Sequence, residues 1–182
     1  RAENILRSVI KMREDLVPAF MAISSISLKK GDREQSYKDL IAAGTLAYRK
    51  GLFDAADRLF YKALELKKDT DFDVYYFLAR VQEEKKNYSM AISYYNRYYS
   101  HTKQVEILIH IGYLYGMQNK FGRAYSYFEK ATSLEPENPM VYFFTGVVKL
   151  WEKKYAEANQ QFKKAMSLKP DEESYYFYSA VA

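Results

Sequence analysis

Apolar side chains recur at three- and four-residue intervals through most of the chain, which predicts amphipathic helices separated by short polar breaks. The segment Val141–Pro170 shows the pattern most clearly, because two helical patterns meet there at a break near Glu152–Lys154. Small residues lie on both patterns, and large apolar residues surround them. Small side chains let two helices approach closely. The segment therefore predicts a helical hairpin.

The same hairpin pattern occurs four times, and successive copies begin 35, 33 and 34 residues apart. The small and aromatic positions that recur are Gly44, Ala56, Phe60 and Ala63; Ala79, Ala91, Tyr95 and Tyr98; Gly112, Ala124, Phe128 and Ala131; and Gly146, Ala158, Phe162 and Ala165. A fixed period of this size is typical of stacked helical hairpins, each of which buries its apolar face against its neighbours.

The repeat predicts two parts in the chain. Residues 1–34 are expected to form an N-terminal helical hairpin, which is either a cap or a decayed repeat. Residues 35–182 are expected to form the array, with repeats near 37–70, 72–104, 105–138 and 139–172 and a partial fifth helix at 173–182. Gly51 is expected to take a left-handed conformation in the turn of the first repeat. Tyr98 replaces the alanine of the other copies and predicts a wider helix spacing near Arg97–His101.

These residues resemble the tetratricopeptide repeat. The positions that carry the resemblance are Tyr142, Gly146, Ala158, Phe162, Ala165 and Pro170, and in the preceding copy Leu108, Ile111, Gly112, Tyr115, Ala124, Phe128, Ala131 and Pro136. Thr145 and Lys149 depart from the family pattern. Over Tyr37–Ala182 the resemblance implies an all-α, right-handed superhelix of antiparallel hairpins. It also implies a non-catalytic protein that binds segments of other proteins in a concave groove lined by first helices.

Mapped onto this chain, the resemblance places eight residues in a partner-binding groove: Tyr76, Arg80, Tyr113, Met117, Phe143, Val147, Leu150 and Trp151. The last four form an apolar stripe on one helix face. Such a stripe is either covered by the rest of the chain or its continuation, or it binds a helix or peptide of a partner protein. In the second case Trp151 is the expected anchor, because aromatic residues dominate binding hot spots.

Some members of this family hold the terminal carboxylate of a partner with Lys, Arg and Asn side chains across three repeats. The corresponding surface of this chain carries Ile41, Thr45, Phe77 and Tyr113. Only Lys38 and Arg80 are basic nearby. We therefore expect no such carboxylate clamp.

The composition favours a soluble, foldable domain, since 48% of the residues are apolar and 28% are charged. The net charge of +5 raises nucleic-acid binding as a less favoured alternative, for which the candidate residues are Lys153, Lys154, Lys163, Lys164 and Lys169. A further alternative is self-association through the ends of the array, as an assembly module of a larger protein. The chain lacks cysteine, and no apolar run approaches the ~20 residues that span a bilayer. The compartment, cytoplasm or periplasm, stays open.

Residues with catalytic or metal-binding chemistry are sparse. His101 and His110 lie outside any metal-ligand spacing, and the seven glycines form no phosphate loop. Asp69, Asp71 and Asp73 lack the Gly and terminal Glu of a calcium loop. We therefore expect no enzyme, no metal and no cofactor. The chain begins at Arg1 and stops within a fifth copy, so we expect an excerpt of a longer protein.

Overall fold

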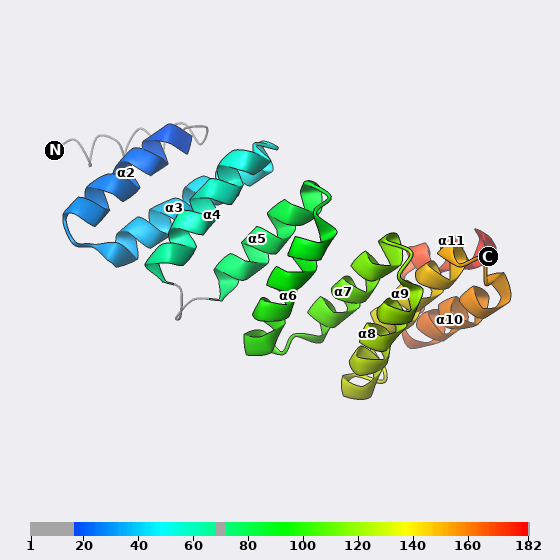
Figure 1. The fold of residues 1–182 in the computed structure, drawn as a ribbon. Coiled ribbons are helices and arrows are strands. Elements are labelled where there is room, and N and C mark those ends of the chain that lie inside the picture. The colour runs from blue at the N-terminus through cyan, green and yellow to red at the C-terminus, as the bar shows by residue number, and fades with distance from the viewer. Residues whose placement is uncertain (1–16, 68–71, 182) are drawn as a thin grey trace. The chain divides into compact units, whose positions relative to one another are not determined.

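The computed structural model describes residues 17–67 and 72–181, which form ten helices without a strand among them (Figure 1). The helices are α2 (Val17–Lys29), α3 (Arg33–Arg49), α4 (Phe53–Leu66), α5 (Asp73–Glu84), α6 (Tyr88–Thr102), α7 (Val105–Met117), α8 (Phe121–Leu134), α9 (Pro139–Trp151), α10 (Tyr155–Leu168) and α11 (Glu173–Val181). The all-α fold predicted from the sequence is confirmed.

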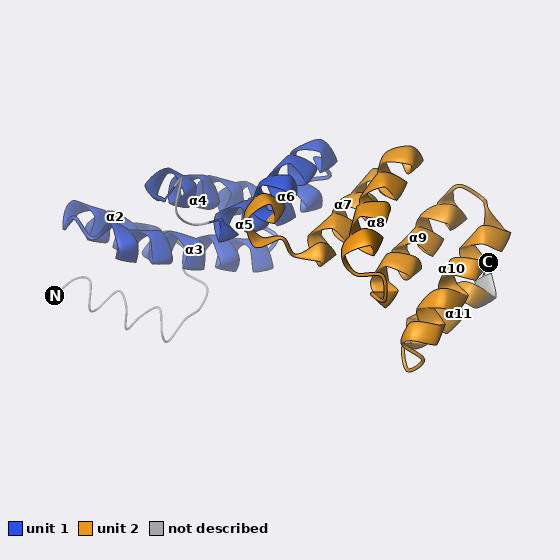
Figure 2. Cartoon of the chain, turned by 90° about the horizontal axis from the view of Figure 1, so that it is seen from below, with its two compact units in different colours: residues 1–98 blue, residues 99–182 orange. Residues whose placement is uncertain are grey.

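The chain divides into two compact units, residues 1–98 and 99–182 (Figure 2). In unit 1, α3 packs on α2 and on α4, and α4 packs on α5. In unit 2, α7 packs on α8, and α9 packs on α7, α8 and α10, while α11 packs on α10. The first helix of the expected N-terminal hairpin lies outside the described residues. The boundary near residue 34 therefore stays a prediction.

A glycine and a phenylalanine sixteen residues apart interlock in three of the hairpins. A Cβ atom added to Gly44 would lie 2.5 Å from Cε1 of Phe60. The corresponding distance is 2.6 Å for Gly112 and Phe128, and again 2.6 Å for Gly146 and Phe162. These distances are shorter than a carbon–carbon contact. The ring therefore occupies the volume that a side chain on the first helix would need.

The other recurring positions are buried as the repeat predicts. Six alanines of the second helices have no exposed surface: Ala56, Ala63, Ala124, Ala131, Ala158 and Ala165. In the second repeat Ala79 and Tyr95 take the places of glycine and phenylalanine, and both are fully buried. Tyr98 is half-buried and lies against Tyr76, with ring centroids 5.4 Å apart. The wider spacing expected at this tyrosine stays a prediction.

Each hairpin turn in the repeats contains one residue with positive φ. Gly51 has φ +72°, as the sequence predicts. The equivalent turn residues are Lys86, Asn119 and Lys153, with φ of 60°, 58° and 63°. A left-handed conformation is costly for a residue with a Cβ atom, and lysine has no special tolerance for it. The same left-handed turn therefore occurs in all four repeats, even where no glycine is present.

Among the described helices, none combines the length and the apolar character needed to cross a membrane.

Replacing Gly146 with alanine should destabilise unit 2 by ~1–3 kcal/mol, because the new methyl group overlaps the buried ring of Phe162. Gly122→Ala is the matched control, since a Cβ atom there meets nothing within 4 Å and alanine favours the helix. Trp151, the single tryptophan, lies in unit 2, so its fluorescence during urea unfolding reports this effect. Equal stability of the two variants would contradict the interlock.

Candidate functional site

An aromatic hollow of about 360 Å³ opens in unit 2. Its lining comes from α7, α9, α10 and α11 and consists of Tyr113, Phe143, Phe144, Val147, Leu150, Trp151, Tyr155 and Tyr178. Every one of these side chains is aromatic or aliphatic, and the only polar side-chain atoms are those of the tyrosine and tryptophan rings. Hollows of this size and character are typical of sites that hold an apolar group of a ligand.

Trp151 is positioned by a close approach of α9 to α7. A Cβ atom added to Gly116 would lie 3.1 Å from Cζ3 of Trp151 and 2.5 Å from Cγ2 of Val148. The indole ring also contacts Tyr113, with ring centroids 5.3 Å apart. Despite these contacts, 39% of Trp151 is exposed. The absence of a side chain at Gly116 therefore makes room for a tryptophan that is held on one side and open on the other.

Phe143 and Val147 form the base of the hollow and are covered by the chain itself. Phe143 lies 5.0 Å from Tyr175 and 5.2 Å from Tyr178 between ring centroids, so it anchors α11. It also contacts Phe162, the ring that interlocks with Gly146. Val147 is buried. Internal packing thus accounts for part of the predicted stripe and leaves Trp151 as its exposed end.

Five of the eight predicted groove residues come together in the aromatic hollow: Tyr113, Phe143, Val147, Leu150 and Trp151. Met117 is exposed on α7 but does not line the hollow. Tyr76 and Arg80 belong to unit 1, where they line a separate, smaller hollow. A continuous groove that includes all eight residues stays a prediction.

Three lining residues escape the sequence prediction, namely Phe144, Tyr155 and Tyr178. Phe144 and Tyr178 hold the same position in consecutive copies, 34 residues apart, and Phe77 holds it in the second repeat. Phe77 lines the hollow of unit 1. An aromatic residue that recurs at a fixed place in the repeat is therefore the signal that could have found Phe144 and Tyr178.

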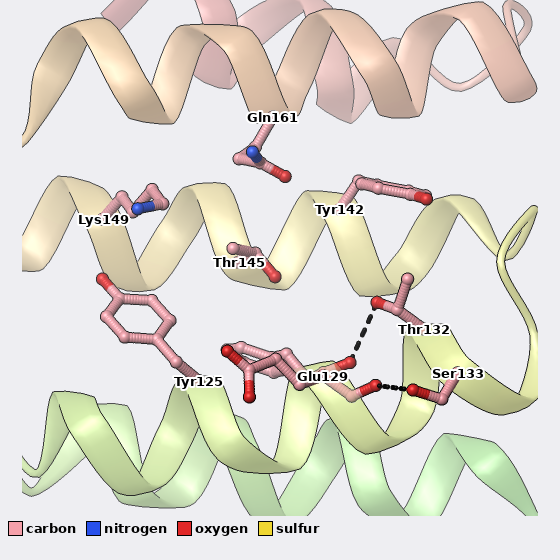
Figure 3. Close-up of a pocket in the computed structure, with 9 residues that line it drawn as sticks. Tyr125, Glu129, Thr132, Ser133, Tyr142, Thr145, Lys149 and Gln161 are labelled. Atoms are coloured by element: carbon pink, nitrogen blue, oxygen red, sulfur yellow. Dashed lines mark hydrogen bonds between the residues drawn. The ribbon is translucent and has the colours of Figure 1, made fainter.

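A second hollow in unit 2, of about 560 Å³, lies among α8, α9 and α10 (Figure 3). Its lining includes Tyr125, Glu129, Tyr142, Thr145, Lys149 and Gln161. Thr145 and Lys149 are the two departures from the family pattern, where the preceding repeat has Ile111 and Tyr115. Shorter or more polar side chains at these positions leave space between neighbouring hairpins.

The polar groups of this second hollow are largely bonded within the chain. Lys149 Nζ pairs with Glu157 and lies 4.9 Å from the centre of the Tyr125 ring. The Tyr125 hydroxyl donates to Glu152 Oε2 at 2.6 Å. Burial raises the pKa of Tyr125, and the bond to Glu152 raises it further, so the hydroxyl stays protonated at neutral pH. Figure 3 shows the Thr132 and Ser133 hydroxyls donating to backbone oxygens.

Charges elsewhere in the described part of the chain suggest no metal site. No group of three or more His, Cys, Asp or Glu side chains within residues 17–67 and 72–181 is arranged to hold a metal ion. In the lysine cluster, Lys154 pairs with Glu152 at 2.8 Å and Lys169 with Glu172 at 2.9 Å. Part of the positive charge considered for nucleic-acid binding is therefore offset by neighbouring carboxylates.

Two sequence profiles described as tetratricopeptide repeat match the chain, at residues 41–104 and 105–138. Together they span more than half of its 182 residues. The chain belongs to the tetratricopeptide repeat (TPR) family. No curated protein matches the sequence significantly.

Several solved structures share the TPR fold. The crystal structure of YrrB has 16% sequence identity and a TM-score of 0.65, over 94% of this chain and 96% of that chain. A tetratricopeptide repeat protein from Parabacteroides merdae has 19% identity and a TM-score of 0.67, over 91% and 71% of the two chains. PilF of Pseudomonas aeruginosa has 24% identity and a TM-score of 0.64, over 82% and 68%. At these identities the likeness establishes the fold alone.

Thr145→Ile should make unit 2 more stable than Thr145→Val by about 0.8 kcal/mol, because the second hollow has room for the extra methylene. Both variants lose the hydroxyl bond to the backbone oxygen of Val141, so their difference isolates the filling of space. Urea unfolding followed by Trp151 fluorescence measures it. A lower stability of the isoleucine variant would show that the space is closed.

Proposed function

We propose that this TPR chain is a non-catalytic interaction scaffold whose unit 2 holds a peptide or helix of a partner protein in the aromatic hollow. The observation that supports this most directly is the state of Trp151. Its indole packs against Gly116 and the Tyr113 ring, yet 39% of the residue is exposed where it lines an apolar hollow. Large aromatic residues in this arrangement are typical of binding hot spots.

The base of the hollow supports the same proposal. Phe143 is packed against Phe162, Tyr175 and Tyr178, so its rotamer is fixed before a partner arrives. A surface that is ordered in advance binds with a smaller loss of conformational entropy. Tyr155 and Trp151 are exposed and stand at the edge of the hollow, where they are available for contact.

The comparisons are consistent with a role in protein binding. TPR proteins bind protein partners, and the family is generally non-catalytic. YrrB is described as a TPR protein with an unusual peptide-binding site. By analogy we assign a peptide or helix as the ligand of this chain.

Self-association is the second candidate, and the exposed face of α11 favours it. Phe177 is 66% exposed and Tyr176 is 48% exposed on this helix. Sedimentation at two protein concentrations separates the candidates, since the average mass of a self-associating chain rises with concentration.

Nucleic-acid binding, the less favoured alternative, is separated by a salt titration. A partner that binds through an apolar hollow keeps its affinity as the salt concentration rises, whereas the affinity for nucleic acid falls steeply.

Trp151→Ala should weaken the binding of a peptide selected from a display library on the full chain by ~2 kcal/mol or more. The truncation removes the exposed indole but leaves Phe143 and Val147 to hold the base of the hollow. Isothermal titration calorimetry measures the affinity, and circular dichroism checks the fold.

Leu134→Ala is the matched control, because Leu134 is 56% exposed in the same unit and lies outside the aromatic hollow. Its affinity for the peptide should equal that of the unchanged chain. If Trp151→Ala also binds with unchanged affinity while keeping its helical signal, the hollow is not the binding site.

A further inference from the structure

Arg80, on α5 of unit 1, is a half-buried cation whose neighbours are tyrosines. Its Nη1 donates to the Tyr76 hydroxyl at 3.3 Å, and its Nη2 donates to the Tyr48 hydroxyl at 3.1 Å. The guanidinium carbon also lies 5.7 Å from the centre of the Tyr48 ring. Within the described residues, no carboxylate forms an ion pair with Arg80. Because a guanidinium has five N–H donors, the two tyrosines leave some of them available.

The carboxylates nearest to Arg80 are bonded to its tyrosine neighbours. The Tyr48 hydroxyl donates to Glu84 Oε1 at 2.9 Å, which places one carboxylate at the far side of the tyrosine. Burial raises the pKa of Tyr48, and the bond to Glu84 raises it further, so the hydroxyl between the two charges is neutral. A second carboxylate, Glu83, accepts from the Tyr95 hydroxyl at 3.0 Å. Both carboxylates therefore bond to tyrosine hydroxyls and not to the guanidinium.

The hollow beside Arg80 has the size of a single side chain. Its volume is about 250 Å³, below the ~300 Å³ at which sites for drug-sized ligands begin. Phe60 and Phe77 are stacked there with ring centroids 5.1 Å apart, and Thr45 and Tyr76 complete the wall. An apolar surface and a cation with unused donors thus lie side by side in unit 1.

We propose that this hollow binds an internal acidic side chain, glutamate or aspartate, of an extended segment of a partner protein. The carboxylate accepts hydrogen bonds from the remaining donors of Arg80, whose planar fork matches two carboxylate oxygens. The aliphatic carbons of the acidic residue contact Phe77, which Phe60 supports from within the core. The site lies in unit 1 and is independent of the aromatic hollow of unit 2, so an experiment can contradict one of the two proposals without contradicting the other.

A terminal carboxylate is the competing source of the same chemistry. A chain end fits less well, because the Lys and Asn side chains of a carboxylate clamp are replaced by Ile41, Thr45 and Phe77 on this surface. The wall instead provides the half-buried rings of Phe77 and Tyr76 for the carbons of a side chain. The experiment therefore includes both sources and a free inorganic anion.

Nuclear magnetic resonance of the nitrogen-15-labelled full chain, observed at the arginine Nε–H signals, tests the proposal. The probes are acetyl-Leu-Glu-Leu-amide, its neutral isostere acetyl-Leu-Gln-Leu-amide, acetyl-Leu-Gln-Leu with a free carboxyl end, and inorganic phosphate. The Arg80 signal should shift saturably with the glutamate peptide, with a Kd at least about tenfold lower than for each other probe, because a charge-assisted bond is lost in the isostere.

Three variants assign the effect to the guanidinium. Arg80→Gln should abolish the preference for glutamate, and Arg80→Lys, which keeps the charge but loses the fork, should weaken binding of the glutamate peptide about fivefold or more. Arg123→Gln is the matched control. Arg123 lies over the Tyr115 ring at 5.6 Å in unit 2 and does not line the hollow of unit 1, so its removal should leave the affinity for the glutamate peptide unchanged. Circular dichroism monitors folding. If Arg80→Gln does not fold, the Arg80→Lys variant tests the proposal instead.

The proposal is overturned if the glutamate and glutamine peptides bind equally, or if none of the probes shifts the Arg80 signal. It is also overturned if only the free carboxyl end or only phosphate binds, since each would identify a different ligand. Unchanged glutamate binding in a folded Arg80→Lys variant would show that the fork is not used.

Discussion

The contact between a glycine on the first helix and a phenylalanine ring on the second determines much of this structure. It occurs at Gly44, Gly112 and Gly146, where the ring lies in the place of a side chain. In these three hairpins the two helices are joined by a turn with a left-handed residue, which is Gly51, Asn119 or Lys153. The buried alanines of the second helices extend the same close packing along each hairpin.

The sequence could predict these contacts because they recur. Gly, Ala and Phe at fixed places in three of the four copies reveal the period, the helix pairs and the buried faces, all of which are local properties of a hairpin. It could not predict which apolar residues stay exposed. Phe143 and Trp151 share one stripe, but Phe143 is covered by Tyr175 and Tyr178 from α11 while Trp151 is left open. That outcome depends on how neighbouring hairpins meet, which no single repeat encodes.

The departures from the repeat are informative in the same way. Thr145 and Lys149 are visible in the sequence as deviations, yet only the packing of α8, α9 and α10 turns them into a hollow. Nothing in the sequence distinguishes Gly116, but in the structure its missing side chain makes room for Val148 and Trp151. Arg80 is similar, because the tyrosines that bond to it come from two different helices of unit 1, α3 and α5. The two proposed sites thus depend on contacts between helices that no single repeat reveals.

A double-mutant cycle at Gly112 and Phe128 tests the central contact most directly. The free energy of unfolding of unit 2 would be measured for Gly112→Ala, Phe128→Leu and the double variant. If the Phe128 ring occupies the space of the missing side chain, Gly112→Ala should lower the free energy of unfolding by at least ~1 kcal/mol less in the Phe128→Leu background than in the unchanged chain. If the losses of stability in the two single variants sum to the loss in the double variant within ~0.5 kcal/mol, the account is contradicted, because independent sites are additive in this way.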